Sequence, residues 1–188
     1  MLNLTDLQIG TFIMHQGDPH IITYCEHSKL GRGRSMLRTK LKNIRSGAII
    51  DYTFKGADKI TEADISRSKT QFLYRQGETF HFMRPDNFEQ FKLTKQSIGT
   101  NADFLKEGEM VDVLLLANEP INISLPIKVE LKIAGTEPGI RGDTAQGSVT
   151  KPAILETGAK IQVPIFIKPG SLVRINTETG EYVERVKK

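Results

Sequence analysis

The sequence predicts an all-β protein built from three small β-barrel domains. Short segments rich in β-branched and aromatic residues recur along the whole chain. Gly and Pro turns separate these segments, which is typical of small barrels. The 188 residues, 38% hydrophobic and 26% charged, have the composition of an ordinary globular protein. We expect domain boundaries near residues 64 and 126, which gives domains 1–64, 65–126 and 127–188. Each is close to the lower size limit for an independent core.

The first block contains three predicted strands, "HIITYCEHS" (20–28), "SMLRTKLKNI" (35–44) and "GAIIDYTF" (47–54). Side chains alternate between the two faces of a strand. In the second segment this period of two places one set on the outer face, namely Met36, Arg38, Lys40 and Lys42. The other face receives Leu37, Thr39 and Leu41, which can pack on a core. We therefore predict a strand with a cationic outer face.

The connection between the first two strands reads "KLGRGR" (29–34). Gly31 and Gly33 flank Arg32 and permit a tight turn with positive φ. The Arg32 side chain is therefore expected alone at the tip of a two-stranded arm. About eight residues at roughly 3.3 Å each project about 25 Å.

Positive charge is concentrated in this arm. The chain as a whole carries only +4. Residues 1–64 contain nine Lys/Arg and seven Asp/Glu, 65–126 contain seven and eight, and 127–188 contain ten and seven. From His27 to Ile50, however, seven cations occur and no acid. Clustered Lys and Arg are what phosphate contacts require. The alternative is a solvated strand face with no ligand.

The middle block, "KTQFLYRQGETFHFMRPDNFEQFKL" (69–93), predicts three strands joined by a Gly-Glu turn and a Pro-Asp turn. Its aromatic residues mostly lie two apart, which suits one buried sheet face; they are Phe72, Tyr74, Phe80, Phe82, Phe88 and Phe91. The rest of the block adds a short helical turn ending at Gly108, then two strands. The third block, from 127 to 188, reads as strands punctuated by Gly and Pro.

Three other motifs contain residue types that can carry chemistry. Cys25 and His27 lie two apart on one strand and do not make a catalytic triad. His15, His20, Cys25 and His27 match no closed zinc pattern. "GRGRS" (31–35) lacks the Gly-Lys-Ser/Thr ending of a phosphate loop. An enzyme remains possible, but none of these residues argues for one, and we expect no metal or cofactor.

The same sequence gives expectations about location. The longest apolar runs, such as "VLLLA" (113–117), fall far below the roughly 20 residues of a membrane span. The start of the chain lacks the pattern of a signal peptide. A single cysteine, Cys25, forms no internal disulfide. These observations favour a cytoplasmic protein without a membrane partner.

Several ordered motifs resemble bacterial translation elongation factor P across essentially the full length. The strongest is "KPAILETGAKIQVPIFIKPG" (151–170), with "EPGIRGDTAQG" (137–147) and "TGEYVERVK" (179–187) flanking it. "RTKLKN" (38–43) after a Gly-basic-Gly tip resembles the first domain of that family, and "FHFM" (80–83) the second. The resemblance implies an SH3-like, KOW-type barrel followed by two OB-like barrels, arranged in an L shape.

The resemblance also implies a function and its sites. Members bind the 70S ribosome between the P and E sites as monomers and relieve stalling at consecutive prolines. They position the CCA end of the peptidyl-tRNA without performing chemistry themselves. Arg32 matches the tip residue, which many members modify; in one group it is an arginine carrying rhamnose added by a rhamnosyltransferase. Contacts to tRNA and ribosomal RNA are implied for Lys29, Gly31, Gly33, Arg34, Arg38, Lys40 and Lys42. Gly142, Asp143 and Thr144 match a loop that approaches the E-site messenger RNA.

The tip departs from both family patterns. Lysine-type members usually read Pro-Gly-Lys-Gly, whereas this chain reads Leu30-Gly31-Arg32-Gly33. Arginine-type members usually lack the second glycine. An arginine has no nucleophilic amine at neutral pH, which excludes lysylation at Arg32. Whether Arg32 is modified, and by which enzyme, stays open. A paralogous ribosome-binding protein with another target, and a general nucleic-acid-binding OB protein, are the alternative functions.

Overall fold

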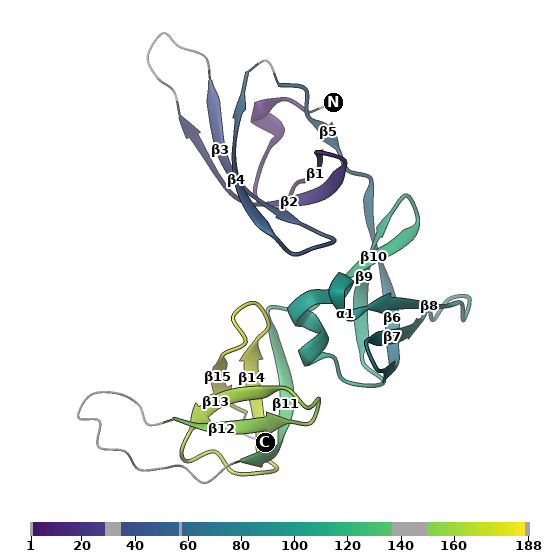
Figure 1. The fold of residues 1–188 in the computed structure, drawn as a ribbon, viewed down its shortest axis with the longest axis vertical. Coiled ribbons are helices and arrows are strands. Elements are labelled where there is room, and N and C mark those ends of the chain that lie inside the picture. The colour runs from purple at the N-terminus through teal and green to yellow at the C-terminus, as the bar shows by residue number, and fades with distance from the viewer. Residues whose placement is uncertain (1, 29–34, 57, 137–149, 187–188) are drawn as a thin grey trace, which may run out of the picture. The chain divides into compact units, whose positions relative to one another are not determined.

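The computed structural model describes residues 2–28, 35–56, 58–136 and 150–186. Its strands form three five-stranded sheets (Figure 1), in the orders β4-β3-β2-β1-β5, β10-β9-β6-β7-β8 and β13-β12-β11-β14-β15. The predicted all-β class with three β domains is therefore confirmed. The chain also divides into two compact units, one made of Met1–Ser68, Leu93–Gly99 and Val113–Asn122. The second unit contains Lys69–Lys92, Thr100–Asp112 and Ile123–Lys188.

The first sheet follows a short 3₁₀ helix, Leu4–Asp6. Its strands are β1 (Phe12–His15), β2 (Asp18–Ser28), β3 (Met36–Asn43), β4 (Ile49–Lys55) and β5 (Thr61–Glu62). The three strands predicted from the sequence correspond to β2, β3 and β4. The short β1 and β5 were not predicted, because pieces of two to four residues leave little periodic signal.

The second sheet contains β6 (Ile65–Gln76), β7 (Thr79–Met83), β8 (Gln90–Thr94), β9 (Met110–Leu116) and β10 (Glu119–Ser124). The helical turn predicted to end at Gly108 lies earlier, as α1 (Lys95–Ile98) and a 3₁₀ helix, Gly99–Phe104. The Thr94 hydroxyl accepts a hydrogen bond from the Ser97 amide at 3.2 Å and caps α1. This capping Thr is the signal that the sequence interpretation missed.

The aromatic residues of the middle block do not all share one buried face. Phe72, Phe80 and Phe82 are buried as expected, but Tyr74 is 45% exposed. The pairing of β6 with β7 shifts by one residue between Phe72 and Tyr74, which turns the Tyr74 side chain to the other face. Phe88 lies in the β7–β8 loop and is 70% exposed. A simple period of two failed here because it assumes an uninterrupted ladder.

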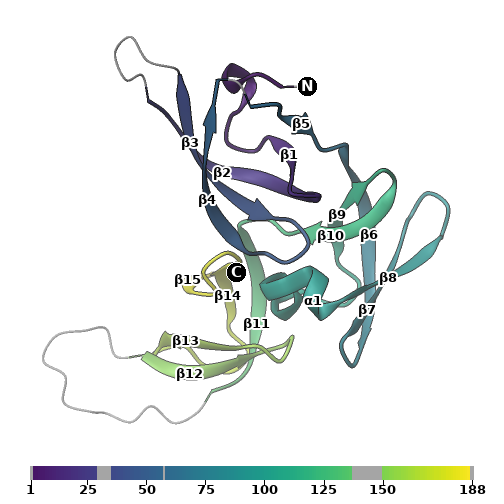
Figure 2. The ribbon, with the colours of Figure 1, turned by 45° about the horizontal axis from the view of Figure 1, so that its top comes forward.

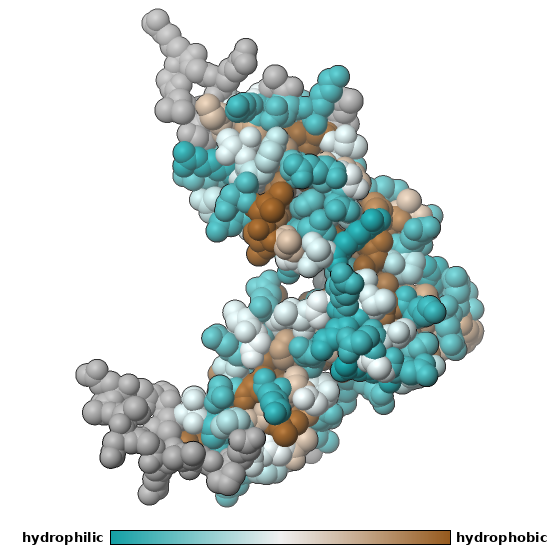
Figure 3. All heavy atoms as spheres, in the orientation of Figure 1, coloured by the Kyte–Doolittle hydropathy of each residue, from teal (hydrophilic) through white to brown (hydrophobic). Residues whose placement is uncertain are grey.

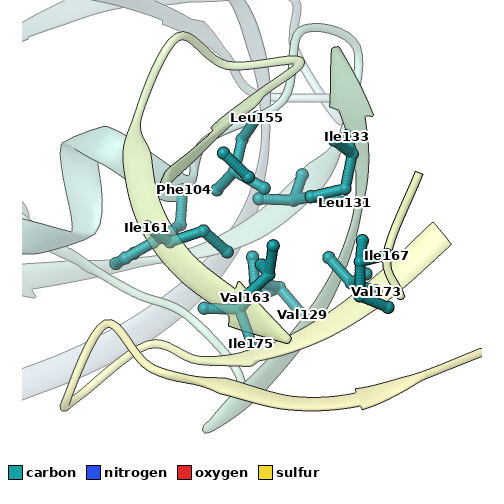
Figure 4. Packing of buried hydrophobic residues seen from close by; sticks show 11 residues of the cluster. Phe104, Val129, Leu131, Ile133, Leu155, Ile161, Val163, Ile167, Val173 and Ile175 are labelled. Atoms are coloured by element: carbon teal, nitrogen blue, oxygen red, sulfur yellow. The ribbon is translucent and has the colours of Figure 1, made fainter. Parts of the chain in front are cut away.

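The third sheet contains β11 (Lys128–Thr136), β12 (Thr150–Leu155), β13 (Lys160–Pro164), β14 (Leu172–Asn176) and β15 (Tyr182–Arg185). Figure 4 shows its core, in which side chains from β11, β12, β13 and β14 converge with Phe104 of the 3₁₀ helix. The Thr157 hydroxyl donates to the Asp103 carbonyl at 2.7 Å beside that contact. The helix of the middle segment is thereby fixed to the third sheet within one unit.

Two clusters of apolar residues stabilise the first sheet. The first fills its interior and consists of Leu7, Ile13, Ile22, Leu37, Leu41, Phe54 and Ile60. The second joins Ile44 to Leu114 and Ile121 of the β9–β10 hairpin, within the same unit. The visible molecular surface is mostly hydrophilic, with small separate hydrophobic patches (Figure 3). Burial on the inner faces therefore leaves the outer face of the first sheet free to carry charge.

Candidate nucleic-acid interface

The candidate site is the outer face of β2, β3 and β4, which lie side by side in both ribbon views (Figures 1 and 2). β2 and β3 pair antiparallel from His20 opposite Asn43 to Ser28 opposite Met36. β4 continues the sheet, with Met36 opposite Lys55 and Lys42 opposite Ile49. The β2–β3 pair therefore leads to both ends of the segment that contains Arg32.

The central strand β3 alternates strictly between the two faces. Leu37, Thr39 and Leu41 are buried. The Thr39 hydroxyl is satisfied by the Tyr52 carbonyl at 2.9 Å, so its burial leaves no unpaired polar group. Its exposed neighbours are Arg38, Lys40 and Lys42. The predicted cationic outer face is confirmed. The Cα atoms of consecutive cations along it are about 6.6–6.8 Å apart, the rise of two residues in a strand.

Two acids, one just before and one just after the cation run in the sequence, lie next to these cations. Glu26 of β2 is opposite Arg38, and Asp51 of β4 is opposite Lys40. Among the described residues, however, no carboxylate lies within 4.0 Å of the charged nitrogen atoms of Arg38, Lys40 or Lys42. The three cations thus retain donors for an external partner.

Glu26 has another partner. The Tyr24 hydroxyl donates to Glu26 Oε2 at 3.2 Å, and Tyr24 is 45% exposed. This hydrogen bond to the carboxylate is the main reason that the pKa of Tyr24 is raised above 10.0. Glu26 is therefore engaged along its own strand rather than by Arg38.

At the end of the site near Asn43, the polar side chains contact one another. Arg45 lies 3.7 Å from Asp18, and the Asn43 side-chain amide donates to the same carboxylate at 3.2 Å. Asn43 Oδ1 accepts from the amides of Arg45 and Ser46, which fixes the β3–β4 turn. Of the cations between His27 and Ile50, Arg45 thus has a structural partner.

Several predicted site residues lie outside the described part of the chain. They are the tip residue Arg32 with its neighbours Lys29, Gly31, Gly33 and Arg34, and the loop residues Gly142, Asp143 and Thr144. The two segments join β2 to β3 and β11 to β12.

The structure also describes the surroundings of the Cys25 and histidine candidates. Cys25 is a half-buried free thiol that packs against the interior of the first sheet. Within the described ranges, no group of three or more His, Cys, Asp or Glu side chains is placed to hold a metal ion. In the same ranges, no helix is both long and apolar enough to cross a membrane.

Comparison with known proteins gives three adjacent matches to family models. An "Elongation factor P (EF-P) KOW-like domain" matches residues 3–60, an "Elongation factor P (EF-P) OB domain" residues 65–123, and "Elongation factor P, C-terminal" residues 129–185. Elongation factor P of Moorella thermoacetica is 45% identical over 98% of this chain and 100% of its own length. The chain belongs to the elongation factor P family. It is therefore related to translation elongation factors.

Other relatives support the same assignment. Elongation factor P of Aquifex aeolicus is 43% identical over 99% of this chain and 96% of its own length. Among solved structures, a eukaryotic translation initiation factor 5A from Methanococcus jannaschii superposes with a TM-score of 0.54 at 22% identity. The superposition covers 65% of this chain and 90% of the initiation factor chain. At this identity the structural likeness concerns the fold only.

Sequence reasoning missed two kinds of residue on this face. Glu26 and Asp51 lie just outside the cation run in sequence, and only strand register places them beside Arg38 and Lys40. Tyr24 was read as part of an ordinary strand, yet it stands on the cationic face. Its position depends on a local shift in pairing, which leaves no simple mark in a periodic pattern.

Proposed function

We propose that this chain binds the 70S ribosome between the P and E sites and stimulates peptide-bond formation at consecutive prolines. Membership of the elongation factor P family carries the proposal. The exposed cations of β3, which have no carboxylate within 4.0 Å among the described residues, support it, because phosphate contacts position a protein on RNA. The β2–β3 pair would then hold Arg32 beside the CCA end of the peptidyl-tRNA.

The proposed mechanism is positioning rather than chemistry. Proline is a constrained secondary amine, and misplacement of reacting groups costs orders of magnitude in rate. A guanidinium offers five donors and keeps its charge at neutral pH, so Arg32 can hold a phosphate backbone by charge-assisted hydrogen bonds. Lys29, Arg34, Arg38, Lys40 and Lys42 would fix the arm to tRNA and ribosomal RNA. The factor would act as a monomer and need no cofactor.

The remaining parts of the proposal concern the other domains. Boundaries near residues 64 and 126 would separate the KOW-type domain and the two OB-like domains. Gly142, Asp143 and Thr144 would approach the E-site messenger RNA. Arg32 is proposed as the modification site if an arginine-modifying enzyme acts on this chain.

A polyproline reporter tests the function directly. In cells that lack this protein, translation through three or more consecutive prolines should stall, and restoring the chain should relieve the stall. Arg32→Ala should abolish relief, whereas Arg174→Met, a cation of the third sheet, should preserve it. Unchanged stalling on restoration would contradict the proposal. Pauses that move to other motifs in ribosome profiling would instead identify a paralogue with another target.

Mass spectrometry tests the modification separately. Intact protein purified from its native cells should show a mass excess that maps to residues 29–34 if Arg32 is modified. An unmodified mass with full activity in the reporter would show that the bare guanidinium is sufficient. That result would leave the positioning mechanism intact.

A further inference from the structure

Tyr24 faces outward because of a one-residue bulge in β2. In an uninterrupted strand, residues two apart share a face, so Tyr24 would lie with Ile22. Ile22 is fully buried, whereas Tyr24 is 45% exposed. Ile22 pairs with Leu41 and Tyr24 with Lys40, so two steps on β2 match one step on β3. Thr23 is the extra residue, and its hydroxyl donates to the Lys40 carbonyl at 3.1 Å. Bulges commonly redirect a side chain in this way.

The bulge places the Tyr24 ring among cations. Lys40 lies directly opposite Tyr24, and Arg38 lies opposite Glu26, the next outward residue of β2. The hydrogen bond to Glu26 ties the hydroxyl along the strand and leaves part of the ring exposed to solvent. The same face therefore offers an aromatic ring and two positive charges in adjacent positions.

This combination matches the chemistry of an unpaired nucleotide. Proteins that bind single-stranded RNA place bases on aromatic rings while nearby cations contact the backbone. A protein partner would need acidic groups to match Arg38 and Lys40, and a paired duplex would keep its bases stacked inside. An exposed base with its phosphate satisfies both the ring and the charges.

We propose that Tyr24 is a stacking platform for an unpaired base of ribosomal or transfer RNA, with Lys40 and Arg38 on the adjacent phosphates. The inference rests on the proposed function, since that function supplies the RNA. It adds a contact that does not depend on charge to a face that otherwise binds through charge alone.

Affinity measurements with 70S ribosomes carrying initiator tRNA test the platform. Tyr24→Ala should weaken binding about five- to 150-fold, as expected for the loss of one stacked base. Tyr24→Phe keeps the ring and should bind within about twofold of the unmodified chain. Tyr74→Ala is the matched control, because Tyr74 is also 45% exposed and follows a similar register shift in β6. Melting temperatures of all three variants should stay close to that of the unmodified chain.

The salt dependence separates stacking from charge. Phosphate contacts release counterions and steepen the dependence of affinity on salt, whereas stacking does not. Tyr24→Ala should therefore lower affinity with an unchanged slope, and Lys40→Ala should flatten the slope. A flattened slope in Tyr24→Ala would contradict the stacking role.

A fluorescent probe gives a direct readout. The chain contains no Trp, so Tyr24→Trp introduces a single indole. Stacking on a base should quench its emission when ribosomes are added, whereas Tyr74→Trp should change little. A photo-cross-linking residue at position 24 should give a nuclease-sensitive product.

Two further outcomes separate failure of the Tyr24 inference from failure of the proposed function. Equal affinities for Tyr24→Ala and Tyr74→Ala, or a cross-link to ribosomal protein alone, would overturn the Tyr24 inference while leaving the proposed function standing. Failure of the unmodified chain to bind ribosomes would overturn both.

Discussion

The outer faces of the first and third sheets both carry basic side chains, but, among the described residues, only in the third sheet are these paired with acids of the neighbouring strands. In each, an inner strand with antiparallel neighbours on both sides carries basic residues on its outer face, three on β3 and one on β14. On β14 of the third sheet, Arg174 lies opposite Glu130 of β11 and Glu184 of β15. Its guanidinium donates to Glu130 at 2.7 Å and also to Glu184. The hydrogen bond to Glu130 is the main reason that the pKa of Arg174 is raised above the ordinary value for an arginine. The charge of Arg174 is therefore paired with carboxylates of its own sheet; we call such a cation compensated, and one without a carboxylate within 4.0 Å open.

The cations of β3 have fewer acids beside them. Arg38 has Glu26 on one side and Thr53 on the other, and Lys40 has Tyr24 and Asp51. Lys42 lies between two isoleucines, Ile21 and Ile49. Each of these cations thus has one acid at most, whereas Arg174 has two. The difference teaches that the cross-strand partners, more than the number of cations, decide whether a basic strand stays open to an external ligand.

The largest effect should come from the feature that both sheets share, their buried inner face. Leu41 and Leu131 are each fully buried. Leu41→Ala should lower the stability of the first sheet by about 2–5 kcal/mol, and Leu131→Ala should do the same in the third. Hydrogen exchange resolved by segment should show faster exchange in the sheet that carries the change. Equal loss in both sheets from one substitution would show that they unfold together.

The next largest effect should fall on binding. The triple variant Arg38→Ala, Lys40→Ala, Lys42→Ala should weaken ribosome binding on the order of a hundredfold, because each lost phosphate contact costs about 1 kcal/mol. Arg174→Met is the control and should leave affinity unchanged. Its melting temperature should fall slightly, since surface ion pairs contribute little. An equal loss of affinity in both variants would show that the open and compensated cations do not differ.

A smaller effect should follow from converting the open face into a compensated one. Thr53→Glu would give Arg38 an acid on each side, as Arg174 has in the third sheet. Ribosome affinity should fall about three- to tenfold, the size of one weakened phosphate contact, while the fold is retained. Thr53→Gln has a similar shape without the charge and should bind normally. Loss of affinity in Thr53→Gln would point to a steric cause instead.

The smallest effect concerns His15 on the side of the first sheet near Tyr52 and Phe54. Desolvation, and then repulsion from His20, lower the pKa of His15 below 6.5. Its ring lies 4.5 Å from that of Tyr52, and its Nε2 atom is buried without a hydrogen-bond partner among the described residues. The unfolded chain therefore binds a proton more readily, so stability should be complete above about pH 6.5 and decrease below it.

Thermal denaturation between pH 7.5 and 5.5 measures this dependence. The melting temperature of the first sheet should fall over that interval, and His15→Phe should reduce the fall. A fall of equal size in His15→Phe would assign the dependence to another group. The third sheet serves as an internal reference, because the change at His15 lies outside its unit.

Much of this arrangement could be predicted from the sequence, for physical reasons visible in particular residues. The alternation of Leu37, Arg38, Thr39 and Lys40 fixed both faces of β3, because a strand buried on one side requires it. The tip glycines and the cation run also predicted an arm for RNA, and this stays a prediction because the tip lies outside the described residues. Alternation does not predict strand register. The sequence pattern therefore could not show that Glu26 lies beside Arg38 and Asp51 beside Lys40. It also failed at Tyr74, where a bulge reverses the faces, and a bulge at Thr23 turns Tyr24 outward in the same way.

The salt dependence of ribosome binding by Lys40→Ala tests the central claim most directly, that the open cations of β3 contact RNA phosphates. The slope of log affinity against log salt should be shallower than that of the unmodified chain by about 0.7–0.9, the value for one phosphate contact. Arg174→Met should keep the full slope. A slope in Lys40→Ala identical to that of the unmodified chain would contradict the account.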